Sequence, residues 1–239
     1  MKRKAFLYGL RAGIPIGLGY FAVSFAFGME AARAGLEVWH AVMISLLNVT
    51  SAGQFAALDI MAAGGSLVEM AATQLIINLR YSLMSFSLSQ KLEKKAPHLH
   101  RFLVAYGVTD EIFGVSAAQE GEVSPYFNYG AMCVAIPGWT IGTLVGAVCG
   151  QILPDGIMSA LGIAVYGMFL AIIIPPAKKS RPVLFAVLVG MVISCLFAYV
   201  PVINQISSGF AIIIATVVAA GLAAVLFPIK EEGVSAHAE

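Results

Sequence analysis

Two adjacent carboxylic acids, Asp110 and Glu111, follow Thr109 within an otherwise apolar stretch of this sequence. Carboxyl groups in such surroundings can bind a cation or carry a proton, since burial favours their neutral form. The same three residues are typical of a helix start, with Thr109 as the cap and the acids favoured by the helix dipole. Both interpretations hold together if the helix begins inside the apolar interior.

A lone arginine, Arg80, lies near the middle of a second apolar run. At the centre of a bilayer its charge costs at least about 2.5–3.5 kcal/mol. Asn78 points nearly the opposite way on an ideal helix, so both side chains line one cavity only if the helix is distorted between them. Otherwise Arg80 pairs with Asp110 or Glu111, or extends to the membrane surface.

Uncharged polar residues interrupt a third apolar run, in the segment from Asn48 to Gln54. Ser51 and Gln54 offer hydrogen-bond donors and acceptors without charge, which suits a zwitterionic ligand or ordered water. The alternative is hydrogen bonding between helices, which is worth about 0.6 kcal/mol on average within a membrane.

Glycines surround a proline near the amino terminus, at Gly13, Pro15 and Gly17. Proline removes a helical hydrogen bond and glycine permits unusual dihedral angles, so the segment can form a broken helix whose free backbone groups bind substrate. Small residues equally allow two membrane helices to pack closely. Both interpretations remain open from the sequence.

The composition indicates an integral membrane protein. Of 239 residues, 59% are hydrophobic and 11% are charged, whereas soluble domains carry about 25% charged residues. The net charge of +1 offers no basic face for nucleic acid. We therefore predict an all-α, polytopic membrane helix bundle in contact with the lipid bilayer.

Eight segments approach the length of about 20 apolar residues that a membrane helix needs. They form one predicted permease domain, 1–229, followed by a polar tail, 230–239. The segments are 12–29, 38–58, 64–90, 102–118, 125–150, 157–175, 182–200 and 207–228.

The basic clusters do not fit eight simple crossings. With the amino terminus inside, the longest basic loop, Lys91–Arg101, would fall outside, against the positive-inside rule. The conflict disappears if segments 38–58 and 102–118, which hold the polar interruptions, fail to cross fully. We therefore expect about seven or eight membrane segments, with one or more broken or re-entrant helices in the first half and both termini cytoplasmic.

No catalytic or cofactor motif is present. The sequence has no P-loop, no H-E-x-x-H and no G-x-S-x-G, and its histidines and cysteines are scattered. A shift of 122 residues aligns Pro15 with Pro137 and little else, so no internal repeat is predicted. We expect no enzyme, no cofactor and no metal site.

An ordered set of short motifs resembles the AzlC family of branched-chain amino acid permeases. The motifs are Gly-Leu-Arg-Ala-Gly-Ile-Pro-Ile-Gly-Leu-Gly-Tyr (9–20), Phe-Gly (27–28), Ser-Ala-Gly-Gln-Phe (51–55), Asn-Leu-Arg-Tyr (78–81) and Thr-Asp-Glu (109–111). The resemblance covers most of the chain in order, length and hydropathy, with fewer landmarks in the carboxyl half.

The resemblance implies a permease subunit of the cell inner membrane that exports leucine, isoleucine or valine. It further implies a small hydrophobic partner of the AzlD type and coupling to the proton gradient. The family's polar signature falls on Gln54, Asn78, Arg80, Thr109, Asp110 and Glu111, and its glycine–proline signature on Gly13, Pro15 and Gly17.

The sequence thus leads to one hypothesis and two rivals. In the hypothesis, the broken segments form a cavity where Arg80 or a helix start meets the substrate carboxylate. Asp110 or Glu111 then meets the ammonium group, carries the proton or neutralises Arg80. The rivals are a channel or transporter for another small solute, and a membrane scaffold whose polar residues join helices.

Overall fold

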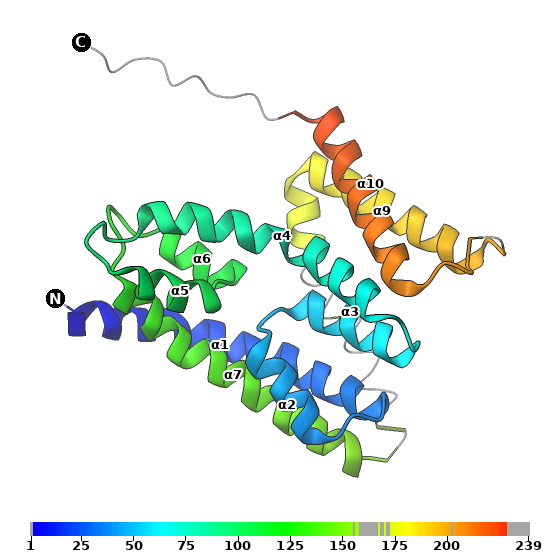
Figure 1. Cartoon of the computed structure of the whole chain (residues 1–239), viewed down its shortest axis with the longest axis horizontal. Helices are drawn as coiled ribbons and strands as arrows, with labels where there is room; N and C mark the ends of the chain where they lie inside the picture. The colour runs from blue at the N-terminus through cyan, green and yellow to red at the C-terminus, as the bar shows by residue number, and fades with distance from the viewer. Residues whose placement is uncertain are drawn as a thin grey trace. The chain divides into compact units, whose positions relative to one another are not determined.

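The computed structural model describes residues 2–154, 156–157, 167, 170, 173–201 and 203–228. The chain divides into two compact units, Met1–Met168 and Phe169–Glu239. Every regular element within the described ranges is a helix (Figure 1), which confirms the predicted all-α class. The single permease domain over 1–229 stays a prediction, and the tail 230–239 lies outside the described residues.

Two long helices, α1 (Lys2–Arg33) and α7 (Pro125–Ile152), form the frame of the first unit. They run side by side in the same direction (Figure 1), with glycines at their contact. A Cβ atom on Gly13 would lie 2.7 Å from the Ala131 carbonyl oxygen, and one on Gly17 would lie 2.8 Å from that of Val134. The packing interpretation therefore holds for both glycines.

The break that was one expectation at Pro15 does not occur. Helix α1 is continuous from Lys2 to Arg33 with Pro15 inside it and exposed. Membrane helices tolerate proline because neighbouring groups or small adjustments satisfy the freed backbone. Gly13, Pro15 and Gly17 thus belong to an intact helix rather than to a broken one.

The first predicted interruption is a true break. Helix α2 (Val38–Leu47) ends before Asn48-Val49-Thr50, and helix α3 (Ser51–Ala62) begins after it. The chain reverses direction at this point (Figure 1). The reversal brings Gln54 Nε2 to 2.8 Å from Ser45 Oγ, whereas residues nine apart on one straight helix would lie about 13.5 Å apart along its axis.

The second predicted interruption breaks in the same way. Helix α4 (Leu67–Lys91) is long and continuous, and α5 (His98–Tyr106) and α6 (Asp110–Ala117) follow it as a second reversing pair (Figure 1). A pattern of one long and two short helices thus occurs twice, in α1–α2–α3 and α4–α5–α6. Thr50 and Thr109 take the same place in each, as extended residues that precede the third helix.

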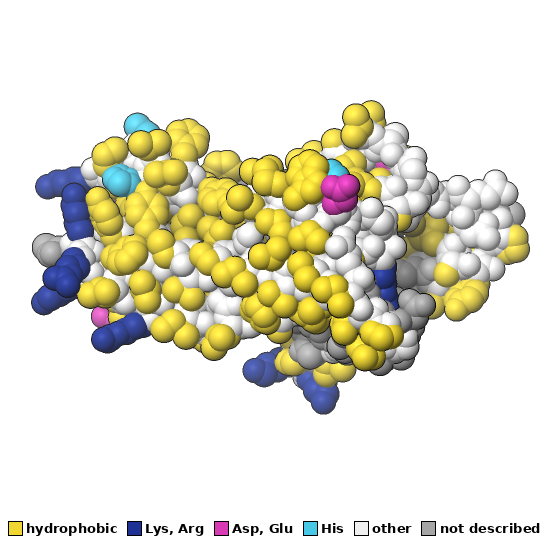
Figure 2. Space-filling model, turned by 90° about the horizontal axis from the view of Figure 1, so that it is seen from below, with side chains coloured by type: hydrophobic (Ala, Val, Ile, Leu, Met, Phe, Trp, Pro, Cys, Tyr) yellow, Lys and Arg dark blue, Asp and Glu magenta, His cyan; other side chains and the backbone are white. Residues whose placement is uncertain are grey.

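The basic clusters at the amino terminus and in the loop Lys91–Arg101 lie at one end of the first unit (Figure 2). Lys2 Nζ is 5.2 Å from the centre of the Tyr126 ring at the start of α7. Leu92, at the start of the basic loop, forms an isolated β-bridge with Val123, which comes just before α7. The opposite end, where α1 and α3 end and α2 and α4 begin, carries four acids: Glu30, Glu37, Asp59 and Glu69. The two basic clusters thus lie at the same end, as the positive-inside rule requires of clusters on the cytoplasmic side.

Four described helices are long and apolar enough to cross a membrane, namely α1, α7, α9 (Arg181–Tyr199) and α10 (Ser208–Leu226). Helices α9 and α10 pack on each other within the second unit, and α9 has no buried residue. Most of the predicted segment 157–175 lies outside the described residues. The predicted total of seven or eight membrane segments is not confirmed.

The glycine contacts give a first prediction. A Cβ atom on Gly28 would lie 2.3 Å from the Thr143 carbonyl oxygen, whereas one on Gly19, in the same helix, meets nothing within 4 Å. We expect Gly28→Ala to lower the free energy of unfolding by about 1–3 kcal/mol, because the helices must separate. Gly19→Ala should have no such effect. Thermal unfolding of the purified protein measures both, and equal midpoints would contradict the packing described.

Candidate polar centre

The two helix breaks face each other in the middle of the first unit. Thr50 and Thr109 are 3% and 4% exposed, although each lies at an irregular point of the backbone. The Tyr106 hydroxyl at the end of α5 donates to the Leu46 carbonyl oxygen at the end of α2. The tips of the two reversing pairs therefore touch.

The start of α6 is capped as the sequence predicts. The Thr109 hydroxyl oxygen accepts from the Ile112 amide at 3.4 Å, and Asp110 and Glu111 occupy the first turn. The positive end of the helix dipole favours both carboxylates there. The cap interpretation is confirmed, and it leaves both carboxylates available for other partners.

Arg80 forms an ion pair with Asp110, one of the alternatives that the sequence left open. Arg80 Nη1 lies 2.9 Å from Asp110 Oδ2, and the side chains are 50% and 46% exposed. The guanidinium group also lies 5.0 Å from the centre of the Tyr81 ring. Because hydrocarbon is a poor environment for charge, water or other protein must cover this face in a membrane.

Asn78 points away from Arg80, as helical geometry requires. Its Oδ1 accepts from the Thr50 hydroxyl at 2.7 Å, and its Nδ2 donates to Gln74 Oε1 at 3.0 Å. Gln74 Nε2 in turn donates to the Gly53 carbonyl oxygen at 2.7 Å. This chain of hydrogen bonds fixes the first break and the start of α3 to α4.

Gln54 belongs to a fully buried network between α2, α3 and α7. Its Oε1 accepts from Trp139 Nε1 at 2.9 Å, and its Nε2 donates to Ser45 Oγ, which lies 2.6 Å from Thr143 Oγ1. Gln54, Ser45 and Thr143 are all 0% exposed. The Gln54 amide is thus held by protein on both sides, whereas Ser51 is partly exposed at the start of α3.

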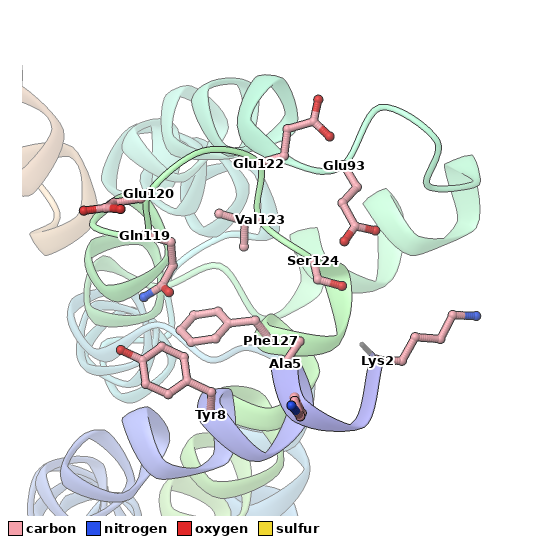
Figure 3. Close-up of a pocket in the computed structure, with 11 residues that line it drawn as sticks. Lys2, Ala5, Tyr8, Glu93, Gln119, Glu120, Glu122, Val123, Ser124 and Phe127 are labelled. Atoms are coloured by element: carbon pink, nitrogen blue, oxygen red, sulfur yellow. The ribbon is translucent and has the colours of Figure 1, made fainter.

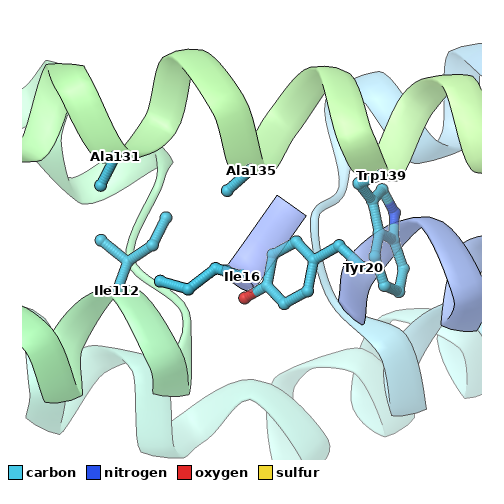
Figure 4. Close-up of a cluster of buried hydrophobic side chains, with 6 residues drawn as sticks. All are labelled: Ile16, Tyr20, Ile112, Ala131, Ala135 and Trp139. Carbon is cyan, nitrogen blue, oxygen red and sulfur yellow. The ribbon is translucent and has the colours of Figure 1, made fainter. Parts of the chain in front are cut away.

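Sequence reasoning missed two residues at the centre, Tyr20 and Trp139. The Tyr20 hydroxyl lies 2.5 Å from Thr109 Oγ1 and donates to a Glu111 carboxylate oxygen. Its ring packs on that of Trp139 with centroids 5.4 Å apart (Figure 4). The available signal was weak: a Tyr or Trp inside apolar sequence needs a hydrogen-bond partner when buried.

A separate hollow of about 500 Å³ opens at the basic end of the first unit (Figure 3). Its apolar wall includes Tyr8 and Phe127, whose ring centroids are 5.7 Å apart. Lysines and glutamates line the same hollow: Lys2, Lys4, Glu93, Glu120 and Glu122. It therefore offers both signs of charge beside an apolar surface.

The polar centre brings groups of both charges close together. The starts of α3 and α6 and the Arg80 guanidinium offer positive charge, and Asp110 and Glu111 offer negative charge. Among the described residues, no group of three or more His, Cys, Asp or Glu side chains could hold a metal ion.

The sequence profile of the AzlC protein family matches residues 15–153. The chain belongs to the AzlC family. The matched range runs from Pro15 in α1 to the end of α7, so it contains both helix breaks, the ion pair and the Tyr20–Trp139 contact. The polar centre therefore lies within the part of the chain that defines the family.

Relatives in this AzlC family are membrane proteins. Inner membrane protein YgaZ of Escherichia coli is 28% identical over 82% of this chain and 84% of its own length. An uncharacterised membrane protein of Archaeoglobus fulgidus is 32% identical over 74% of this chain and 78% of its own length. One of Helicobacter pylori is 28% identical over 62% of this chain and 65% of its own length. No solved structure matches the chain significantly.

The ion pair gives a second prediction. Arg80→Ala and Asp110→Ala should each lower the thermal midpoint, because each leaves the other charge unpaired. The double variant should lower the free energy of unfolding by less than the sum of the two single effects. The difference, which is the coupling energy, should be about 0.5–1 kcal/mol for this half-exposed pair.

A double-mutant cycle on the purified protein measures that coupling. The matched control is the pair Glu30–Arg33, whose charged atoms are 2.8 Å apart and whose residues lie three positions apart on one helix. It should couple by only a few tenths of a kcal/mol. Additive effects of the Arg80 and Asp110 substitutions would contradict the pairing.

Proposed function

We propose that this AzlC family member is a permease subunit that exports branched-chain amino acids from the cell, driven by the proton gradient, and is not an enzyme. The proposal rests on the family, on the resemblance stated from the sequence, and on one structural observation. That observation is the meeting of two helix breaks at a polar centre which carries Arg80, Asp110 and Glu111.

In a membrane, the two reversing pairs are re-entrant. Helices α2 and α3 enter from the acidic end and return to it, and α5 and α6 do the same from the basic end (Figure 1). Irregular backbone at membrane depth is tolerated where it is packed in protein or lines a cavity. Many transporters place their substrate at such breaks, between repeats of opposite orientation.

The substrate would bind by both ends of its zwitterion. Its carboxylate would meet Arg80 and the partial positive charges at the starts of α3 and α6, where Ser51 and Thr109 lie. Its ammonium group would meet Asp110 or Glu111, one of which also carries the coupled proton. In this arrangement Gln54 and Asn78 shape the site from behind, since their amides are bound to other helices.

The basic end of the first unit would face the cytoplasm. The positive-inside rule places the amino-terminal cluster and the loop Lys91–Arg101 there, and we place both termini on that side of the inner membrane. The hollow beside Tyr8 and Phe127 (Figure 3) would be the entrance through which cytoplasmic substrate approaches. A small membrane subunit of the AzlD type would complete the permease.

Efflux from cells or vesicles loaded with leucine, isoleucine and valine tests the proposal. Arg80→Ala, Asp110→Asn and Glu111→Gln should each slow efflux roughly tenfold or more, since each removes a charged contact with the substrate or proton. Arg33→Ala, which removes a partly exposed ion pair away from the centre, should leave efflux unchanged. Membrane insertion of every variant is verified by its yield in the membrane fraction.

Four results of these measurements would contradict parts of the proposal. Unchanged efflux in all three variants would remove the site. Efflux that persists after an uncoupler collapses the proton gradient would remove proton coupling. If only other amino acids or organic acids leave the vesicles, the transported solute is not a branched-chain amino acid. Loss of folded protein without altered flux would favour a membrane scaffold.

A further inference from the structure

Tyr20 and Trp139 form an aromatic pair between the two helix breaks. Tyr20 comes from α1 and Trp139 from α7, and they are 7% and 2% exposed. Their rings meet edge to face at 78°, with centroids 5.4 Å apart (Figure 4). The pair is thus part of the frame made by α1 and α7.

Each ring carries its polar atom to a different helix start. The Tyr20 hydroxyl reaches Thr109 and Glu111 at the start of α6. The Trp139 indole N–H reaches Gln54 in the first turn of α3, at 2.9 Å. One pair of touching rings therefore holds both helix starts in place.

The other buried side-chain links between the frame and the breaks serve one reversing pair each. Ser45 bonds Thr143 and holds α2 to α7, and Ser116 bonds Asn128 at 2.9 Å and holds α6 to α7. Tyr106 does join the two tips directly, but its side chain lies at the surface with 46% exposure. Among these hydrogen-bonded links of the described residues, the aromatic pair is the buried one that reaches both helix starts.

We propose that Tyr20 and Trp139 are positioning residues that couple the starts of α3 and α6, so that release of one helix start loosens the other. Glu111 is one end of this link. An ammonium group or a proton that binds the Glu111 carboxylate breaks its hydrogen bond with the Tyr20 hydroxyl. Through the two rings, this change also acts on the contact between Trp139 and Gln54. Coupling between two sites requires an element whose equilibrium both sites bias. The ring contact is that element.

Hydrogen exchange of backbone amides tests the coupling in the full chain in lipid nanodiscs without substrate. The probes are the amides that close the first turns of α3 and α6, those of Gln54 and Phe113. Tyr20→Phe keeps the ring and removes the hydroxyl. It should speed exchange at Phe113, and also speed exchange at Gln54 by about two- to tenfold, the range expected for an aromatic contact.

Trp139→Phe should give the mirror result, with faster exchange at Gln54 and a smaller increase at Phe113. Matched controls break a buried bond to one side only. Ser116→Ala should speed exchange at Phe113 alone, and Thr143→Ala should speed exchange at Gln54 alone.

The proposal is overturned if Tyr20→Phe and Trp139→Phe behave like these controls and change exchange only on their own side. It is also overturned if Tyr106→Phe, rather than Tyr20→Phe, transmits the effect. The measurement uses no transported solute, so its failure is distinct from failure of the proposed export. Thermal midpoints of all variants exclude global unfolding as the cause of faster exchange.

Discussion

The need to satisfy freed backbone groups at two helix breaks governs the centre of this protein. A helix that stops inside a membrane leaves amides and carbonyls without partners, and each unsatisfied group costs several kcal/mol there. Side chains near the breaks supply the missing bonds. Thr109 accepts from the Ile112 amide at the start of α6, and Tyr106 donates to the Leu46 carbonyl at the end of α2. The polar residues that interrupt the apolar sequence are therefore first a structural requirement.

The α1–α7 pair supplies the rigid frame on which the breaks depend. Glycines such as Gly13 and Gly17 let the two backbones approach directly, in a membrane where small residues favour helix contact. Close approach places Tyr20 and Trp139 edge to face between the breaks. The reversing pairs attach to this frame by buried apolar clusters and by a few buried hydrogen bonds.

The sequence predicted the two helix breaks from two independent features. Eight simple membrane crossings would put a basic loop on the wrong side, and the two segments that could fail to cross both contain polar residues. It also predicted the Thr109 cap and Arg80–Asp110 as one pairing. It left open whether α1 breaks at Pro15 or continues through it, since packing against α7 is invisible in one sequence. It missed Tyr20 and Trp139, whose partners lie about a hundred residues away, and the twofold helix pattern, which repeats geometry without repeating residues. Hydrophobic periodicity indicates the helix that contains a residue, whereas these features depend on contacts with helices far away in the sequence.

Thiol labelling of single cysteines at the breaks tests most directly whether they meet at a solvent-reached substrate site. Cys133, Cys149 and Cys195 are first replaced, and a cysteine is placed at Val49 or Val108, within the two breaks. Val108 is only 6% exposed in the structure, so labelling there requires the break to open to solvent. The proposed function predicts that a membrane-impermeant reagent labels both positions in vesicles, and that leucine slows both reactions. A loop cysteine at Lys94 should be labelled at a rate that leucine does not alter. If Lys94 is labelled while both breaks stay unreactive, or if leucine protects neither break, the breaks are packed elements and the substrate site lies elsewhere.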